Sequence, residues 1–143
     1  QQSFKHLSTM NRTHLEGAAE ALAAQQGYAF HTGPEDGMAH TVRSYPAAWL
    51  APLELHAVEG CGHGRATYDM TLHLLSSGAR LSPTERRAAL ARMEEQLLEI
   101  FAALSLDERV LAVEGLSVRP RAFALTPHGE ISQTAAARIV TFF

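Results

Sequence analysis

Residues 67–75, Thr67-Tyr68-Asp69-Met70-Thr71-Leu72-His73-Leu74-Leu75, alternate between polar and apolar side chains, and this alternation decides the fold. Tyrosine, methionine and leucine occupy the even positions, while threonine, aspartate and histidine occupy the odd positions up to residue 73. Because successive side chains of a strand point to opposite faces of its sheet, the period of two predicts a strand. One face is apolar and the other polar, which is typical of an antiparallel sheet covered on one side.

The cluster Gly60-Cys61-Gly62-His63-Gly64 precedes this strand and contains the only cysteine of the chain. A cysteine nucleophile needs a base at a fixed distance and often a helix N-terminus, and a glycine-rich turn before a strand provides neither. A metal site needs three or four ligands, whereas Cys61 and His63 supply two. A phosphate-binding glycine loop would have to open a helix, but a strand follows here. Glycines between two alternating runs instead predict the turn of a β-hairpin.

Two helices are predicted, one on each side of this hairpin. The first covers residues 8–26, where leucine and alanine recur at helical spacing and Gly27 follows as a C-cap. The second covers residues 83–104. Its start signal is nearly complete, with Ser82 as N-cap, Pro83 at the first helical position and Glu85 as the partner of a capping box. Its apolar stripe consists of Leu90, Met93, Leu97, Ile100, Phe101 and Leu104.

Extended segments make up most of the remaining chain. Besides the strand at 65–75, they are a short run at 28–30, a run from about His40 to Leu50, and runs at 52–59, 110–119 and 130–143. Residues 31–37 are expected to form a loop. The fold class predicted from this order is α+β, with a mostly antiparallel sheet of about four to five strands and two helices packed on one face. Residues 1–143 are expected to form a single domain.

Composition and charge exclude several classes of protein. The formal net charge is −3 and no block of lysine or arginine stands out, so we expect no sequence-specific nucleic-acid binding. No apolar run approaches the roughly 20 residues that cross a bilayer, and no signal-peptide pattern is present, so we expect no membrane partner and a cytoplasmic location. The eight histidines are many for this length. None of them shows the i, i+4 spacing of a zinc-binding helix.

The polar face of the central strand is the remaining place for a binding site. Thr71 and His73 share that face, and Arg119 and Arg138 could reach it from neighbouring strands. One hypothesis is therefore a small α+β ligand-binding module or enzyme that uses these four residues. The alternative interpretation is a polar sheet surface or a contact between subunits. On balance we assign no catalytic, cofactor-binding or metal-binding residue and no cofactor, and we expect no enzymatic activity.

Strand length points to self-association. Residues 65–75 and 130–143 form segments about twice as long as a typical strand of ~5–6 residues. At ~3.3 Å per residue they would reach about 36 to 46 Å, whereas the helix at 83–104 spans about 33 Å. The chain also finishes on the apolar run Ile139-Val140-Thr141-Phe142-Phe143. Uncovered strand edges and apolar ends favour pairing with another chain, so we expect a homo-oligomer.

The order of elements resembles a known family. An N-terminal helix, the strand Tyr45-Pro46-Ala47-Ala48-Trp49-Leu50, the glycine hairpin, the strand at 68–75, a capped long helix and a closing hairpin follow one another. From about His14 onward this layout is similar to that of the tail terminator and head–tail joining proteins of long-tailed phages and prophages, including minor tail components. The resemblance implies a structural protein without catalytic residues. It would form a ring, such as a hexamer, contact tail and head-connector proteins, and become part of the virion. The abundance of histidine departs from what the resemblance implies.

Overall fold

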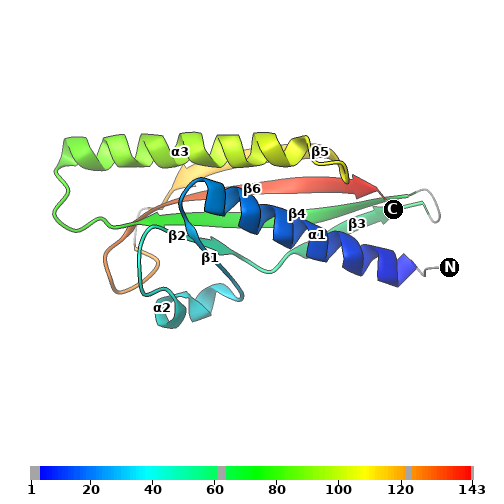
Figure 1. The fold of residues 1–143 in the computed structure, drawn as a ribbon, viewed down its shortest axis with the longest axis horizontal. Helices are drawn as coiled ribbons and strands as arrows, with labels where there is room; N and C mark the ends of the chain where they lie inside the picture. Colours follow the sequence, from blue (N-terminus) through cyan, green and yellow to red (C-terminus); the bar gives the residue numbers. More distant parts are fainter. Residues whose placement is uncertain (1–3, 61–63, 122–123, 143) are drawn as a thin grey trace.

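The computed structural model describes residues 4–60, 64–121 and 124–142, and side chains from Asn11 onward (Figure 1). Its helical elements are α1 (Phe4–Gln25), the short 3-10 helix η1 (Glu35–Gly37), α2 (Met38–Thr41) and α3 (Pro83–Ser105). Its strands are β1 (Ala29–Thr32), β2 (Ala47–Leu50), β3 (Glu54–Glu59), β4 (Arg65–Ser76), β5 (Val110–Pro120) and β6 (Ile131–Phe142). None of the helices in this described part of the chain is long and apolar enough to pass through a bilayer.

The six strands form one sheet in the order β1-β2-β4-β6-β5, and β3 also pairs with β4. All pairs are antiparallel except β1 with β2. The whole of β4 pairs with β6, from Arg65 opposite Phe142 to Ser76 opposite Ile131. Along its other edge, β4 pairs first with β3 and then with β2. Two successive short strands therefore share the edge opposite one long partner.

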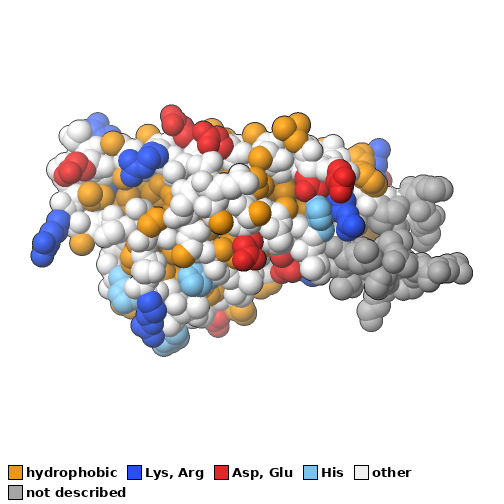
Figure 2. Space-filling view, viewed as in Figure 1, with side chains coloured by type: hydrophobic (Ala, Val, Ile, Leu, Met, Phe, Trp, Pro, Cys, Tyr) orange, Lys and Arg blue, Asp and Glu red, His pale blue; other side chains and the backbone are white. Residues whose placement is uncertain are grey.

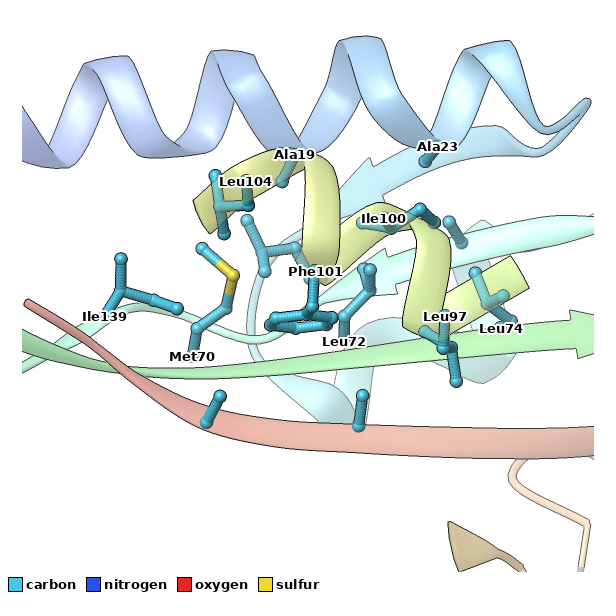
Figure 3. Close-up of a cluster of buried hydrophobic side chains, with 14 of the residues drawn as sticks. Ala19, Ala23, Met70, Leu72, Leu74, Leu97, Ile100, Phe101, Leu104 and Ile139 are labelled. Carbon is cyan, nitrogen blue, oxygen red and sulfur yellow. The ribbon is translucent and has the colours of Figure 1, made fainter. Parts of the chain in front are cut away.

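The two long helices pack on the same face of this sheet (Figure 1). Phe101 of α3 lies against Met70 and Leu72 of β4, beneath Ala19 of α1 (Figure 3). The alternation along β4 explains this arrangement, because its even-numbered side chains are buried under the helices and its odd-numbered ones face away. The main core consists of Leu15, Ala19, Tyr68, Met70, Leu72, Leu74, Met93, Leu97, Ile100, Phe101, Leu104 and Ile139, among others.

A smaller apolar cluster covers one end of the opposite face. It joins Met38 and Val42, at α2, to Trp49 of β2 and Leu75 of β4. Tyr45 and Leu125 pack at its margin. Beyond this cluster the middle of that face carries polar side chains. We call the whole face opposite the two long helices the open face.

Local signals fix the ends of both long helices. Ser82 accepts a hydrogen bond from the Glu85 backbone N–H, and the Glu85 side chain accepts one from the Ser82 N–H, so the predicted capping box of α3 is present. At the end of α1, Gly27 has a φ of 89°, the left-handed conformation that a glycine C-cap provides. His14 of α1 also contacts Asp107, just after α3, at 2.8 Å, which ties the two helices together.

The predicted α+β class with a mostly antiparallel sheet is confirmed, but three details are wrong. The sheet has six strands and not four to five, because β1 and β2 are both present as short separate strands. The run from His40 to Leu50 is not one strand, since His40 lies in α2 and only Ala47–Leu50 is extended. The expected loop at 31–37 contains the end of β1 and the 3-10 helix η1. Pro46 precedes β2, as its missing N–H requires.

Cys61, Gly62 and His63 lie outside the described residues. On either side of them, β3 and β4 pair antiparallel with Glu59 opposite Arg65, and Gly60 has a φ of 73°. The flanking strands thus form the predicted hairpin.

Replacing Phe101 by alanine should remove the side chain that fills the space between α3 and β4. A buried Phe→Ala change costs about 3–5 kcal/mol because it combines lost apolar burial with a cavity. We therefore expect Phe101→Ala to lower the free energy of unfolding by this amount in a urea titration. Leu98→Ala is the matched control, since Leu98 lies on the same helix with 45% of its surface exposed and should change stability by less than about 0.5 kcal/mol. Equal effects of the two changes would contradict this assignment of the core.

Candidate functional site

A row of side chains crosses the open face from β1 to β5. The strand registers place His31 opposite Trp49, Trp49 opposite His73, His73 opposite Thr134, and Thr134 opposite Arg119. Residues directly opposite one another in adjacent strands share a face and lie close enough to interact. The rings of His31 and Trp49 stack at 6.0 Å between centroids. We call these five residues the cross-sheet row.

His73 is the most buried titratable group of the row, with 1% of its surface exposed. Its Nδ1 lies 2.7 Å from Oγ1 of Thr134. Its Nε2 lies 3.1 Å from Oε2 of Glu35 in η1. The alignment of this second contact is poor, so Nε2 has no hydrogen-bond partner among the described residues. Burial lowers the pKa of His73, and the nearby Arg121 lowers it further, while Glu35 acts in the opposite direction. His73 is consequently neutral at pH 7.

The neighbours of His73 determine which nitrogen carries its proton. A neutral imidazole has one N–H donor and one acceptor nitrogen. A lone pair on Nε2 would face the Glu35 carboxylate and be repelled by it, so the proton is assigned to Nε2. Nδ1 is then the acceptor, and the hydroxyl of Thr134 donates to it. The hydroxyl proton of Thr134 therefore points toward the buried His73 ring.

Two shallow hollows lie side by side on the open face. The first, which we call the arginine hollow, has a volume of about 520 Å³ and is lined by Ser117, Arg119, Arg121, Leu125, Thr134 and Ala136, among others. The second, the acidic hollow, has a volume of about 390 Å³ and is lined by residues that include Asp69, Thr71, Glu114, Ala136 and Arg138. Ala136 borders both hollows, so they are neighbours on the face, but only the second is lined by carboxylates.

In the acidic hollow the charges largely compensate one another. Asp69 lies 3.3 Å from Nδ1 of His56 and 3.7 Å from Nε of Arg138. Both contacts are well exposed to solvent, and such ion pairs contribute about 0–1 kcal/mol. Glu114 stands opposite Arg138 in the β5–β6 register. This hollow is therefore a solvated network of paired charges.

The four residues singled out in the sequence do lie on one face, but not in one site. His73 and Arg119 belong to the cross-sheet row, whereas Thr71 and Arg138 line the acidic hollow. Sequence reasoning missed Glu35, Thr134 and Arg121. Glu35 was missed because a predicted loop at 31–37 gives its residues no defined position. Thr134 and Arg121 were missed because their positions near His73 depend on strand pairing.

The histidines are dispersed over the molecule. Several lie near the β1–α2 end (Figure 2, lower left), while His14 contacts Asp107 and His56 contacts Asp69. His128 stands edge-on to Tyr45 at 6.4 Å. Within residues 11–60, 64–121 and 124–142, whose side chains the structure describes, no group of three or more histidine, cysteine, aspartate or glutamate side chains could hold a metal ion.

The burial of His73 predicts a pH dependence of stability. Because its pKa in the folded state is lower than the unfolded value of 6.5, the unfolded chain takes up a proton first as the pH falls. The contribution of this group is complete above that value and is lost as the pH falls through the folded pKa. We expect the Tm to drop between pH 7 and pH 5, and His73→Gln to reduce that drop in thermal melts.

His128→Gln is the control for this measurement, because His128 is exposed. It should keep the pH dependence of the parent protein. A pH profile that is unchanged in His73→Gln would show that other groups cause it. The low pKa of Asp107, which hydrogen bonds from Arg109 and His14 maintain against the effect of burial, affects stability only in more acidic solution.

No protein-family model matches this chain, and no curated protein matches it.

Proposed function

We propose that this protein is a structural assembly component that associates with copies of itself and has no enzymatic role. The order of its elements, with α1, β2, the β3–β4 hairpin, the capped α3 and the β5–β6 hairpin, supports a similarity to ring-forming tail terminator and head–tail joining proteins of long-tailed phages. In this role it would occupy the virion after assembly in the cytoplasm. Its partners would be further copies of itself, arranged in a ring such as a hexamer, and tail and head-connector proteins.

The observation that carries this proposal is the apolar end of the sheet, which consists of Leu106, Leu111 and Phe142. Their exposed fractions are 85%, 46% and 46%. Their backbones lie at the same end of the molecule, because Val110 pairs with Thr141, which precedes Phe142, and the Val110 N–H binds the carbonyl of Asp107, which follows Leu106. Large apolar side chains that gather at one end of a molecule are typical of an association surface.

The adjacent strand edge supports a second copy as the occupant of this surface. Among the described strands, β5 pairs only with β6, so the backbone groups along its outer edge have no strand partner. The ladder between β5 and β6 is irregular between Val110 and Ala112, which sets Leu111 apart from the regular pairing. Apolar side chains beside an unpaired strand edge favour contact with another protein chain. The outer surface of α3, by contrast, carries many charged side chains (Figure 2).

Charged substitutions at the apolar end should separate the copies. We expect Leu111→Arg and Phe142→Arg to shift the protein from an oligomer to a monomer in mass photometry and sedimentation. Loss of a central interface side chain costs about 2 kcal/mol or more, which corresponds to roughly a thirtyfold rise in dissociation constant. Negative-stain images of the parent protein should show rings.

Leu98→Arg is the matched control, because Leu98 is exposed to the same extent as Leu111 but lies on the outer face of α3. It should leave the oligomer intact. A parent protein that remains monomeric across micromolar concentrations would contradict the proposal. Equal disruption by all three variants would show that the apolar end is not the contact.

A further inference from the structure

The arginine hollow is lined by two arginines, Arg119 and Arg121, whose side chains are exposed to solvent. Neither has a carboxylate partner among the described residues. No aspartate or glutamate lines the hollow. In the neighbouring acidic hollow, by contrast, Arg138 contacts Asp69. The two hollows differ in charge although they share the same sheet face and the border residue Ala136.

The backbone holds these two arginines close together. Arg119 pairs with Thr134 near the end of β5, and the Arg121 N–H donates to the Ser132 carbonyl at 3.2 Å, which continues the β5–β6 pairing. Side chains two residues apart on extended chain point to the same side. Their guanidinium groups therefore both contribute positive potential over one hollow, which favours an anion there.

The groups around the arginines determine which hydrogen-bond donors face the hollow. His73 lies behind Thr134 and is neutral, and Glu35 lies on the far side of the imidazole from Thr134. Because Thr134 donates its proton to His73, the remaining side-chain donors toward the hollow are the two guanidiniums and the Ser117 hydroxyl. A guanidinium binds carboxylate or phosphate oxygens through two parallel hydrogen bonds.

The remaining lining is apolar and gives the hollow a second property. Pro120, Leu125 and Ala136 provide carbon surface beside the arginines. The volume of about 520 Å³ lies within the range of ~300–1,000 Å³ that small-molecule sites occupy. The ligand that fits this chemistry has an anionic head and a compact apolar body.

We propose that the arginine hollow is a binding site for a small organic anion, a phosphate or carboxylate attached to an apolar group, with Arg119 and Arg121 holding the anionic head. This function is independent of self-assembly. It gives the uncovered part of the open face a ligand, and the unpaired arginines a partner.

Calorimetric titration with three probes tests the proposal. Phenyl phosphate has both the charge and the apolar body, inorganic phosphate has the charge alone, and phenol has the ring alone. We expect phenyl phosphate to bind most tightly, inorganic phosphate more weakly, and phenol not at all at millimolar concentration. Equal binding of phenol and phenyl phosphate, or no saturation by phenyl phosphate at ten millimolar, would overturn the proposal.

Matched variants locate the site. Arg119→Gln and Arg121→Gln should each weaken phenyl phosphate binding at least tenfold, whereas Arg138→Gln should leave it unchanged, because Arg138 belongs to the acidic hollow. Thermal melts would confirm that all three variants fold. Unchanged affinity in both hollow variants, or equal loss in Arg138→Gln, would show that the anion binds elsewhere or only through general charge.

The assembly variant separates this proposal from the proposed function. Leu111→Arg changes the apolar end and leaves the arginine hollow intact, so it should bind phenyl phosphate with the affinity of the parent protein. Retained binding in a monomeric variant supports a site contained in one chain. Binding that disappears together with the oligomer would overturn the proposal, since the anion would then need a second copy.

Discussion

The full-length pairing of β4 with β6 is the constraint on which the rest of the structure depends. Every residue of β4 has an opposite residue in β6, from Arg65 to Ser76. Because the side-chain period of a strand is two, a shift of one residue would exchange all buried and exposed positions. The register is fixed by four large apolar side chains that must be buried on the face covered by the helices, namely Tyr68, Met70, Leu72 and Leu74. The same register then decides which polar side chains meet on the open face.

Packing is distributed unequally over the two faces. Both long helices cover one face, and the cluster around Trp49 and Leu75 covers only one end of the other. Strands of this length extend beyond what the small cluster around α2 can cover (Figure 1). The middle of the open face therefore stays accessible, and the polar residues of β4, β5 and β6 form its surface. An association surface and a ligand hollow are two different uses of area that the helices leave uncovered.

The sequence predicts the helices and strands of this fold better than it predicts the contacts between them. The β4 alternation and the capping box at Ser82 are local patterns, so both could be read directly and both are present. The segment 40–50 has no clear period, and tertiary contacts of Met38 and Val42 with Trp49 decide its conformation instead. His73 could be placed on the polar face from the alternation alone. Its contacts with Thr134 and Glu35 depend on strand register and on the placement of η1, which no local pattern encodes.

The cross-sheet row is less favourable for stability than an apolar row would be. The imidazole of His73 is buried, and its Nε2 faces the Glu35 carboxylate at 3.1 Å without a well-aligned hydrogen bond, so burying this polar ring opposes stability. Trp49 and Leu75 on the same side of the sheet show that this region accommodates large apolar side chains. Arg119 at the end of the row and Arg121 beside it have no carboxylate partner among the described residues. Features that oppose stability in this way are typical of binding sites, which is why the row and the arginine hollow, and not the charge-compensated Asp69 network, are where a ligand is expected.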